Sequence, residues 1–170
     1  MSNPLELLYQ EHQVIKKALS NVLGLKNMIL ENPENYKSEL KNYIGFFRNY
    51  ADKFHHQKEE NILFPEMGKK KEHLGDGVIQ EMLDNHSDFR EMLADIESLN
   101  NAGEFDESFK KFEKYNHELL NHIAVEDDEV FQMALSILDS DDLDKIYYRF
   151  LDTDSNLGMD NKHAMEKMVN

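Results

Sequence analysis

The chain has 170 residues, of which 34 are acidic and 19 are basic, so its net charge at neutral pH is −15. Such an acidic surface repels phosphate backbones and anionic headgroups, and we expect neither nucleic acid nor a membrane as a partner. The absence of cysteine rules out disulfides, thiolate catalysis, iron–sulfur ligation and cysteine-type zinc sites. No apolar run approaches the roughly 20 residues of a membrane span and no signal peptide is recognisable, so we expect one cytoplasmic domain over residues 1–170.

Long helices are predicted from the spacing of apolar residues and from starts in which proline takes the first helical position. The first predicted helix runs from Pro4 to about Glu31, and the second from Pro33 to about 68–71. The third runs over about 76–101, and the fourth begins after the turn at 101–106 and ends near Leu138. Short connections between helices of this length predict an all-α fold, an up-down-up-down antiparallel four-helix bundle over about 3–139. A short helix over 141–151, a loop over 152–158 and a weak terminal helix would form a C-terminal appendage over about 140–170.

Two histidine–glutamate pairs with four-residue spacing stand next to each other in the second predicted helix. On a wheel that turns 100° per residue, His55 and Glu59 lie beside the apolar stripe, which includes Phe54. His56 and Glu60 are rotated toward the solvated side of the same wheel. We therefore expect the His55–Glu59 pair to face the core.

The same pair recurs on the apolar face of the fourth helix as His122 and Glu126, and His12 and His86 are single inward histidines on the first and third helices. Distances along the helices place these groups within about a turn of one level. Two ionised carboxylates buried there without a metal would cost roughly several kcal/mol each. Imidazole and carboxylate ligands suit iron, zinc or manganese, so the sequence predicts a metal site; a polar core network without metal is the alternative.

The strings YQEHQVI, FHHQKEENILFP, LDNHSDFR and LLNHIAVEDDEVF resemble the hemerythrin-like (HHE cation-binding) family and extend over most of the chain. The resemblance implies a non-haem centre of two iron ions, bridged by carboxylates and by oxo or hydroxo groups, that binds O2 or a related small molecule. The ligand positions that it implies are also the inward residues of the wheels, namely His12, His55, Glu59, His86, His122 and Glu126.

The third helix departs from the oxygen-carrying members of the family, which have a second histidine one turn after the position of His86. Arg90 stands there in this chain. Either one iron has an open position, or another residue completes the coordination or orients a ligand. The candidates for these roles are His56, Glu60, Arg90, Tyr9, Tyr115 and His163.

Three functions are compatible with the sequence. The first is a carrier, store or sensor of O2 or of another small diatomic or peroxide ligand. The second is a di-iron redox or repair protein that handles nitric oxide or peroxide, or donates iron to iron–sulfur clusters. The third is a metal-independent interaction bundle with an unidentified protein partner. The sequence does not decide whether the protein is an enzyme.

Overall fold

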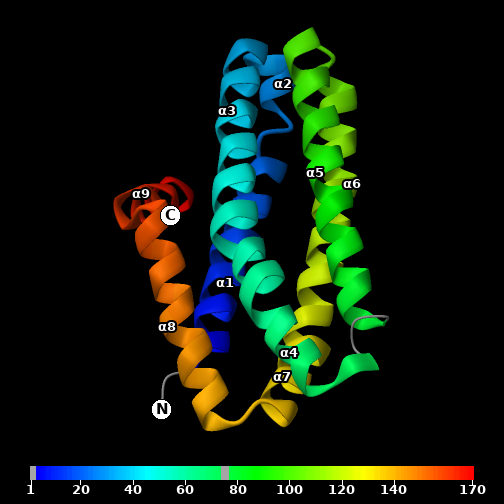
Figure 1. Ribbon diagram of the computed structural model, residues 1–170. Coiled ribbons are helices and arrows are strands. Elements are labelled where there is room, and N and C mark those ends of the chain that lie inside the picture. The colour runs from blue at the N-terminus through cyan, green and yellow to red at the C-terminus, as the bar shows by residue number, and fades with distance from the viewer. Residues whose placement is uncertain (1–2, 74–76) are drawn as a thin grey trace.

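The computed structural model describes residues 3–73 and 77–170, and all regular secondary structure in these ranges is helical (Figure 1). The helices are α1 (Pro4–Leu23), α2 (Met28–Glu31), α3 (Pro33–Phe46), α4 (Phe64–Lys70), α5 (Val78–Ala102), α6 (Phe105–Val125), α7 (Phe131–Ile137), α8 (Ser140–Leu157) and α9 (Met159–Val169). Wider π-helical segments are η1 (Phe47–His56), η2 (Glu59–Leu63) and η4 (Glu126–Val130). The predicted all-α class is confirmed. No helix among the described residues has the length and hydropathy needed to cross a membrane.

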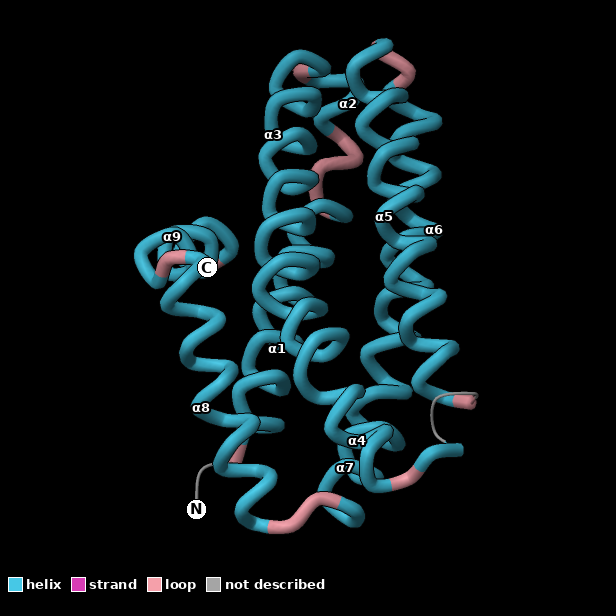
Figure 2. The backbone as a smooth tube through the Cα atoms, viewed as in Figure 1, coloured by secondary structure: helices cyan, strands magenta, loops and turns pink. Residues whose placement is uncertain are grey.

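The longest helical stretches form rods that lie alongside one another (Figure 1, Figure 2). Helices α1 and α5 are two of these rods. A third is the continuous stretch from α3 through η1 and η2 to α4, and a fourth is the continuous stretch from α6 through η4 to α7. Helix α8 runs beside α1, and α9 folds over at its end, so that both contact α1 and η1. The C-terminal residues therefore pack against the rods that supply much of the site.

Two predicted boundaries are wrong. The first helix ends at Leu23 rather than near Glu31, because the chain turns over residues 24–27 before the short α2. The predicted loop over 152–158 is helical as far as Leu157, because buried contacts of Asp154 outweigh the low helix propensity of this polar stretch. Only Gly158, with a φ of 103°, interrupts the helix there. The predicted start at residue 76 lies outside the described residues.

The interior consists of two apolar clusters with a polar layer between them. In α1, Leu5 and Leu8 belong to the cluster that also involves α4, α7 and α8. Ile15 and Leu19 belong to the cluster that also involves α3, α5 and α6, and buried His12 lies between the two. The other rods repeat this order and place their histidines or glutamates at the same level. Apolar burial on both sides thus holds the polar layer in place.

Candidate metal centre

Seven buried side chains form the polar layer, and none of them is more than 3% exposed. They come from α1, η1, η2, α5, α6 and η4 and are His12, His55, His56, Glu59, His86, His122 and Glu126. Their ligand atoms fall into two groups, each within 4.8 Å, one formed by His12, His55, Glu59 and Glu126 and the other by His56, His86 and His122. The structure therefore brings together all six inward residues expected from the sequence and adds His56.

The position of His56 corrects the helical wheel, which turned this residue toward solvent. Its side chain is buried, and its ring stacks on that of His86 with centroids 3.8 Å apart. The reason is the π-helical geometry of η1, whose hydrogen bonds close over five residues instead of four. Each residue then rotates by less than 100°, so the adjacent residues His55 and His56 both reach the interior.

Glu59 stands between two sets of imidazoles. Its Oε1 atom lies 3.3 Å from Nε2 of His55, and its Oε2 atom lies 3.5 Å from Nε2 of His86. The carboxylate therefore presents one oxygen to each set. We call His12 and His55 the two-histidine side, and His56, His86 and His122 the three-histidine side.

Glu126 has the same relation to the two sides. Its Oε2 atom lies 3.3 Å from Nε2 of His12, and its Oε1 atom lies 3.1 Å from Nε2 of His122. Both glutamates are thus oriented as carboxylates that could bridge two cations.

Several of these polar atoms are buried without a hydrogen-bond partner among the described residues. They are both carboxylate oxygens of Glu59 and of Glu126 and the Nε2 atoms of His12 and His55. Buried carboxylates without hydrogen bonds cost several kcal/mol each unless another positive group compensates them. A metal cation is the partner that suits carboxylate oxygen and imidazole nitrogen together. The donor set therefore fits metal binding.

The buried carboxylates also raise the pKa of two imidazoles, because a protonated ring supplies the positive charge that they lack. Burial disfavours the charged form of His55, but the carboxylates of Glu59 and Glu11 outweigh it and raise the pKa of His55 to about 10. Burial also opposes charge on His86, whose pKa is nevertheless raised to about 9 by carboxylates, Glu126 first among them. The polar layer is thus an environment that attracts cations.

All five imidazoles of the polar layer have a polar partner at Nδ1. The pairs are His12 with Asp127 at 2.7 Å, His55 with Glu11 at 2.9 Å, His56 with Asp52 at 3.3 Å, His86 with Glu60 at 2.8 Å and His122 with the amide of Asn85 at 3.2 Å. A carboxylate at Nδ1 keeps a proton on that nitrogen, so Nε2 is the atom that would bind a metal, with release of its own proton where the ring is charged. Glu60, a candidate ligand or orienting residue from the sequence, thus contacts His86 from outside the layer.

Glu11 also belongs to a buried charged network that reaches the C-terminal helices. Nζ of Lys162 lies 2.6 Å from both Glu11 and Asp154, and Nζ of the fully buried Lys58 contacts the same two carboxylates. The sequence analysis missed this network. Its one sequence signal is that Lys58 follows Phe54 by four residues and so falls within the predicted apolar stripe.

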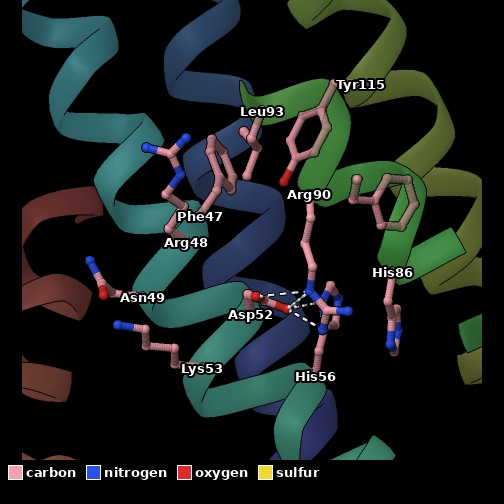
Figure 3. Close-up of a pocket in the computed structure, with 11 residues that line it drawn as sticks. Phe47, Arg48, Asn49, Asp52, Lys53, His56, His86, Arg90, Leu93 and Tyr115 are labelled. Atoms are coloured by element: carbon pink, nitrogen blue, oxygen red, sulfur yellow. Dashed lines mark hydrogen bonds and ion pairs between the residues drawn. The ribbon is translucent and has the colours of Figure 1, made fainter. Parts of the chain in front are cut away.

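Arg90 takes no place among the potential ligands. Its side chain is 42% exposed, and its Nη2 atom donates to Asp52 at 2.7 Å (Figure 3). The same atom donates to Glu60 at 2.7 Å. Through these carboxylates the guanidinium supports the orientation of His56 and His86 from outside.

The remaining candidates from the sequence lie in three different settings. The hydroxyl of Tyr9 donates to the backbone oxygen of Asp127 at 3.1 Å, and the side chain of the same residue orients His12. Tyr115 is buried beside the three-histidine side. His163 is exposed on α9, where the neighbouring Lys162 points inward instead.

A comparison with protein families gives a match to the family model described as hemerythrin HHE cation binding domain, over residues 3–134. The matched range contains the whole polar layer and ends before α8 and α9. No curated protein and no solved structure gives a significant match to the chain.

Proposed function

We propose, since the chain belongs to the family of hemerythrin HHE cation-binding domains, that it binds two iron ions in the polar layer and takes up O2 or a related small molecule there. The family membership itself establishes cation binding as the coarser function. We also propose that the rods form a single antiparallel four-helix bundle, with α8 and α9 as its appendage. The cytoplasmic location expected from the sequence stays a prediction.

The observation that supports two ions is the position of the two glutamates, each with one oxygen toward each set of imidazoles. One ion would be held by the two-histidine side and the other by the three-histidine side, with Glu59 and Glu126 as ligands of both. Bound iron would supply open coordination positions and electrons for the uptake of a small molecule.

The rest of the chain orients these ligands and excludes water. The carboxylates at Nδ1 fix the tautomer and direction of four of the five imidazoles. The two apolar clusters cover the polar layer on both of its faces and keep water away from it. Electrostatic interactions within the layer are stronger as a result, because the local dielectric constant is low.

A redox or repair protein that handles nitric oxide or peroxide, or donates iron, is the alternative. It was suggested by Arg90, which stands where oxygen carriers of the family have a histidine. The inward position of His56 favours the first function, because it supplies a fifth imidazole from η1 in place of the one that α5 lacks.

The decisive experiment loads the full chain anaerobically with ferrous iron, measures iron per chain, and records the absorption spectrum when O2 is added and removed. We expect about two irons and a charge-transfer band that appears with O2 and disappears without it. The variant His117→Ala, which removes an exposed histidine, is the control and should behave as the parent. Two irons that oxidise without a reversible band would favour the alternative. Failure to bind iron would contradict both.

A further inference from the structure

A cavity of about 280 Å³ lies beside the three-histidine side, between η1, α5 and α6 (Figure 3). The imidazoles of His56 and His86 line it, together with Phe47, Phe89 and Leu93. A diatomic molecule needs far less space, so the cavity is large enough for an organic ligand.

Tyr115 contributes a buried polar group without a partner. Its side chain is 1% exposed, and its hydroxyl points into the cavity toward the level of the Asp52–Arg90 pair (Figure 3). The hydroxyl makes no hydrogen bond with another described residue, so it can donate to a molecule in the cavity. Burial raises the pKa of Tyr115, so the group stays neutral and offers an O–H donor. This donor calls for an acceptor on a ligand.

Two further donors without partners lie at the cavity. Arg90 uses Nε and Nη2 in its bonds to Asp52 and Glu60, which leaves Nη1 unused among the described residues. Lys53 also lines the cavity and has no ion pair among the described residues, and its ammonium group points away from Tyr115 and Arg90 (Figure 3). Asp52, in contrast, already accepts from Arg90 and His56. The unused hydrogen-bonding capacity thus favours an acceptor, and the cations favour a negative one.

We propose that this cavity binds a small carboxylate with an aromatic body. Its oxygens would accept from the Tyr115 hydroxyl and the Arg90 guanidinium, and its ring would pack against Phe47 and Leu93. Two of the residues that line the cavity, His56 and His86, are also ligands in the proposed function, so the bound molecule would lie next to the three-histidine side. The donors that would hold its carboxylate, Tyr115 and Arg90, are not metal ligands.

The probe for this site is benzoate, with benzyl alcohol as a neutral molecule of similar size. Isothermal titration calorimetry is carried out on the full chain in metal-free and iron-loaded forms, so a failure of iron binding leaves this test intact. We expect one benzoate per chain in both forms, and an affinity for benzyl alcohol that is about tenfold weaker. Equal affinities for the two molecules would overturn the assignment of a carboxylate.

Two variants locate the binding. Leu93→Trp fills the cavity and should abolish benzoate binding, and Tyr115→Phe keeps the shape but should weaken binding about fivefold. Leu135→Trp places the same new side chain at a position that is 41% exposed on α7 and should bind benzoate as the parent does. Unchanged affinity in Leu93→Trp or in Tyr115→Phe, or no benzoate binding by the parent, would overturn the proposal. Because Tyr115→Phe removes only a hydroxyl, it decides the matter even if Leu93→Trp does not fold.

Discussion

The two sides of the polar layer differ in how their histidines are supported. On the two-histidine side, the side chain of Glu11 is 3% exposed and is held by the buried ammonium groups of Lys58 and Lys162. On the three-histidine side, the orienting carboxylates are 25% and 22% exposed, and a half-exposed guanidinium joins them. The support of His55 is therefore internal, while His12 on the same side is oriented by Asp127, which is 18% exposed. The support of His56 and His86 lies at the surface beside a cavity.

This difference has a physical consequence for the two sides. A fully paired buried network is rigid, because removing any member leaves an uncompensated charge in a low dielectric. Ion pairs near the surface are weak and screened, so their side chains can rearrange at small cost. We infer that the two-histidine side mainly holds its ion, and that small molecules approach on the three-histidine side.

The largest expected effect comes from Glu59→Ala, which removes the carboxylate shared by both sides. Both ions lose a ligand, and Glu126 alone remains to balance their charge, so iron should fall from about two per chain to nearly none. Elemental analysis after anaerobic loading and desalting measures this. The matched control is Glu60→Ala, which changes the next residue outside the layer. Because Glu60 only orients His86, this variant should weaken the three-histidine side by about tenfold and still take up both irons when ferrous iron is in excess. Loss of iron from the control but not from Glu59→Ala would mean that the wrong pair has been assigned.

His56→Ala tests whether the two-histidine side and the three-histidine side are separate ion sites. We expect one iron per chain to remain at the two-histidine side, while the affinity of the other site falls by more than about 100-fold. His55→Ala should do the reverse, and a stepwise ferrous titration distinguishes the two. If His56→Ala binds both irons as tightly as the parent, the fifth imidazole is not a ligand.

His56 also marks the limit of what the sequence predicts. The helices and the convergence of six side chains could be predicted, because apolar residues at a spacing of 3.6 define both a helix and its buried face. The wheel failed for His56 because it assumes α-helical rotation throughout. Nothing in the local sequence shows that η1 is π-helical, since its geometry depends on contacts with the other rods.

The buried lysines were missed for a related reason. Sequence rules place lysine at the surface, because an unpaired buried ammonium group is very costly. The partners that make burial of Lys58 possible, Glu11 and Asp154, are far away along the chain and meet it only in the folded protein. Their pairing depends on how α8 packs against α1 and η1, which the periodicity of single helices does not specify.

Lys162→Met tests the internal support of the two-histidine side. The substitution leaves the carboxylates of Glu11 and Asp154 with Lys58 alone, and we expect the free energy of unfolding to fall by about 3 kcal/mol. The iron affinity of this side should fall about tenfold, because Glu11 orients His55 less firmly. Urea denaturation and ferrous titration measure the two effects. The control, Lys167→Met, changes an exposed lysine of the same helix, and a similar loss in both variants would show that the network has no special role.

Arg90→Gln should have the smallest effect, because it acts on the surface support of the three-histidine side. The guanidinium is 42% exposed, so the free energy of unfolding should change by less than about 1 kcal/mol. Asp52 and Glu60 lose a shared donor but still accept from His56 and His86, and we expect the iron affinity of this side alone to fall by a factor below about ten.

The matched control for Arg90→Gln is Arg149→Gln, which removes a guanidinium of similar exposure that pairs with Glu66 at 2.8 Å, away from the polar layer. This variant should bind both irons as the parent does. A ferrous titration that separates the two sites decides the outcome. Equal weakening of both sites by Arg90→Gln would mean that the two sides are not supported independently. A selective effect would establish that the surface ion pairs tune only the side that borders the cavity.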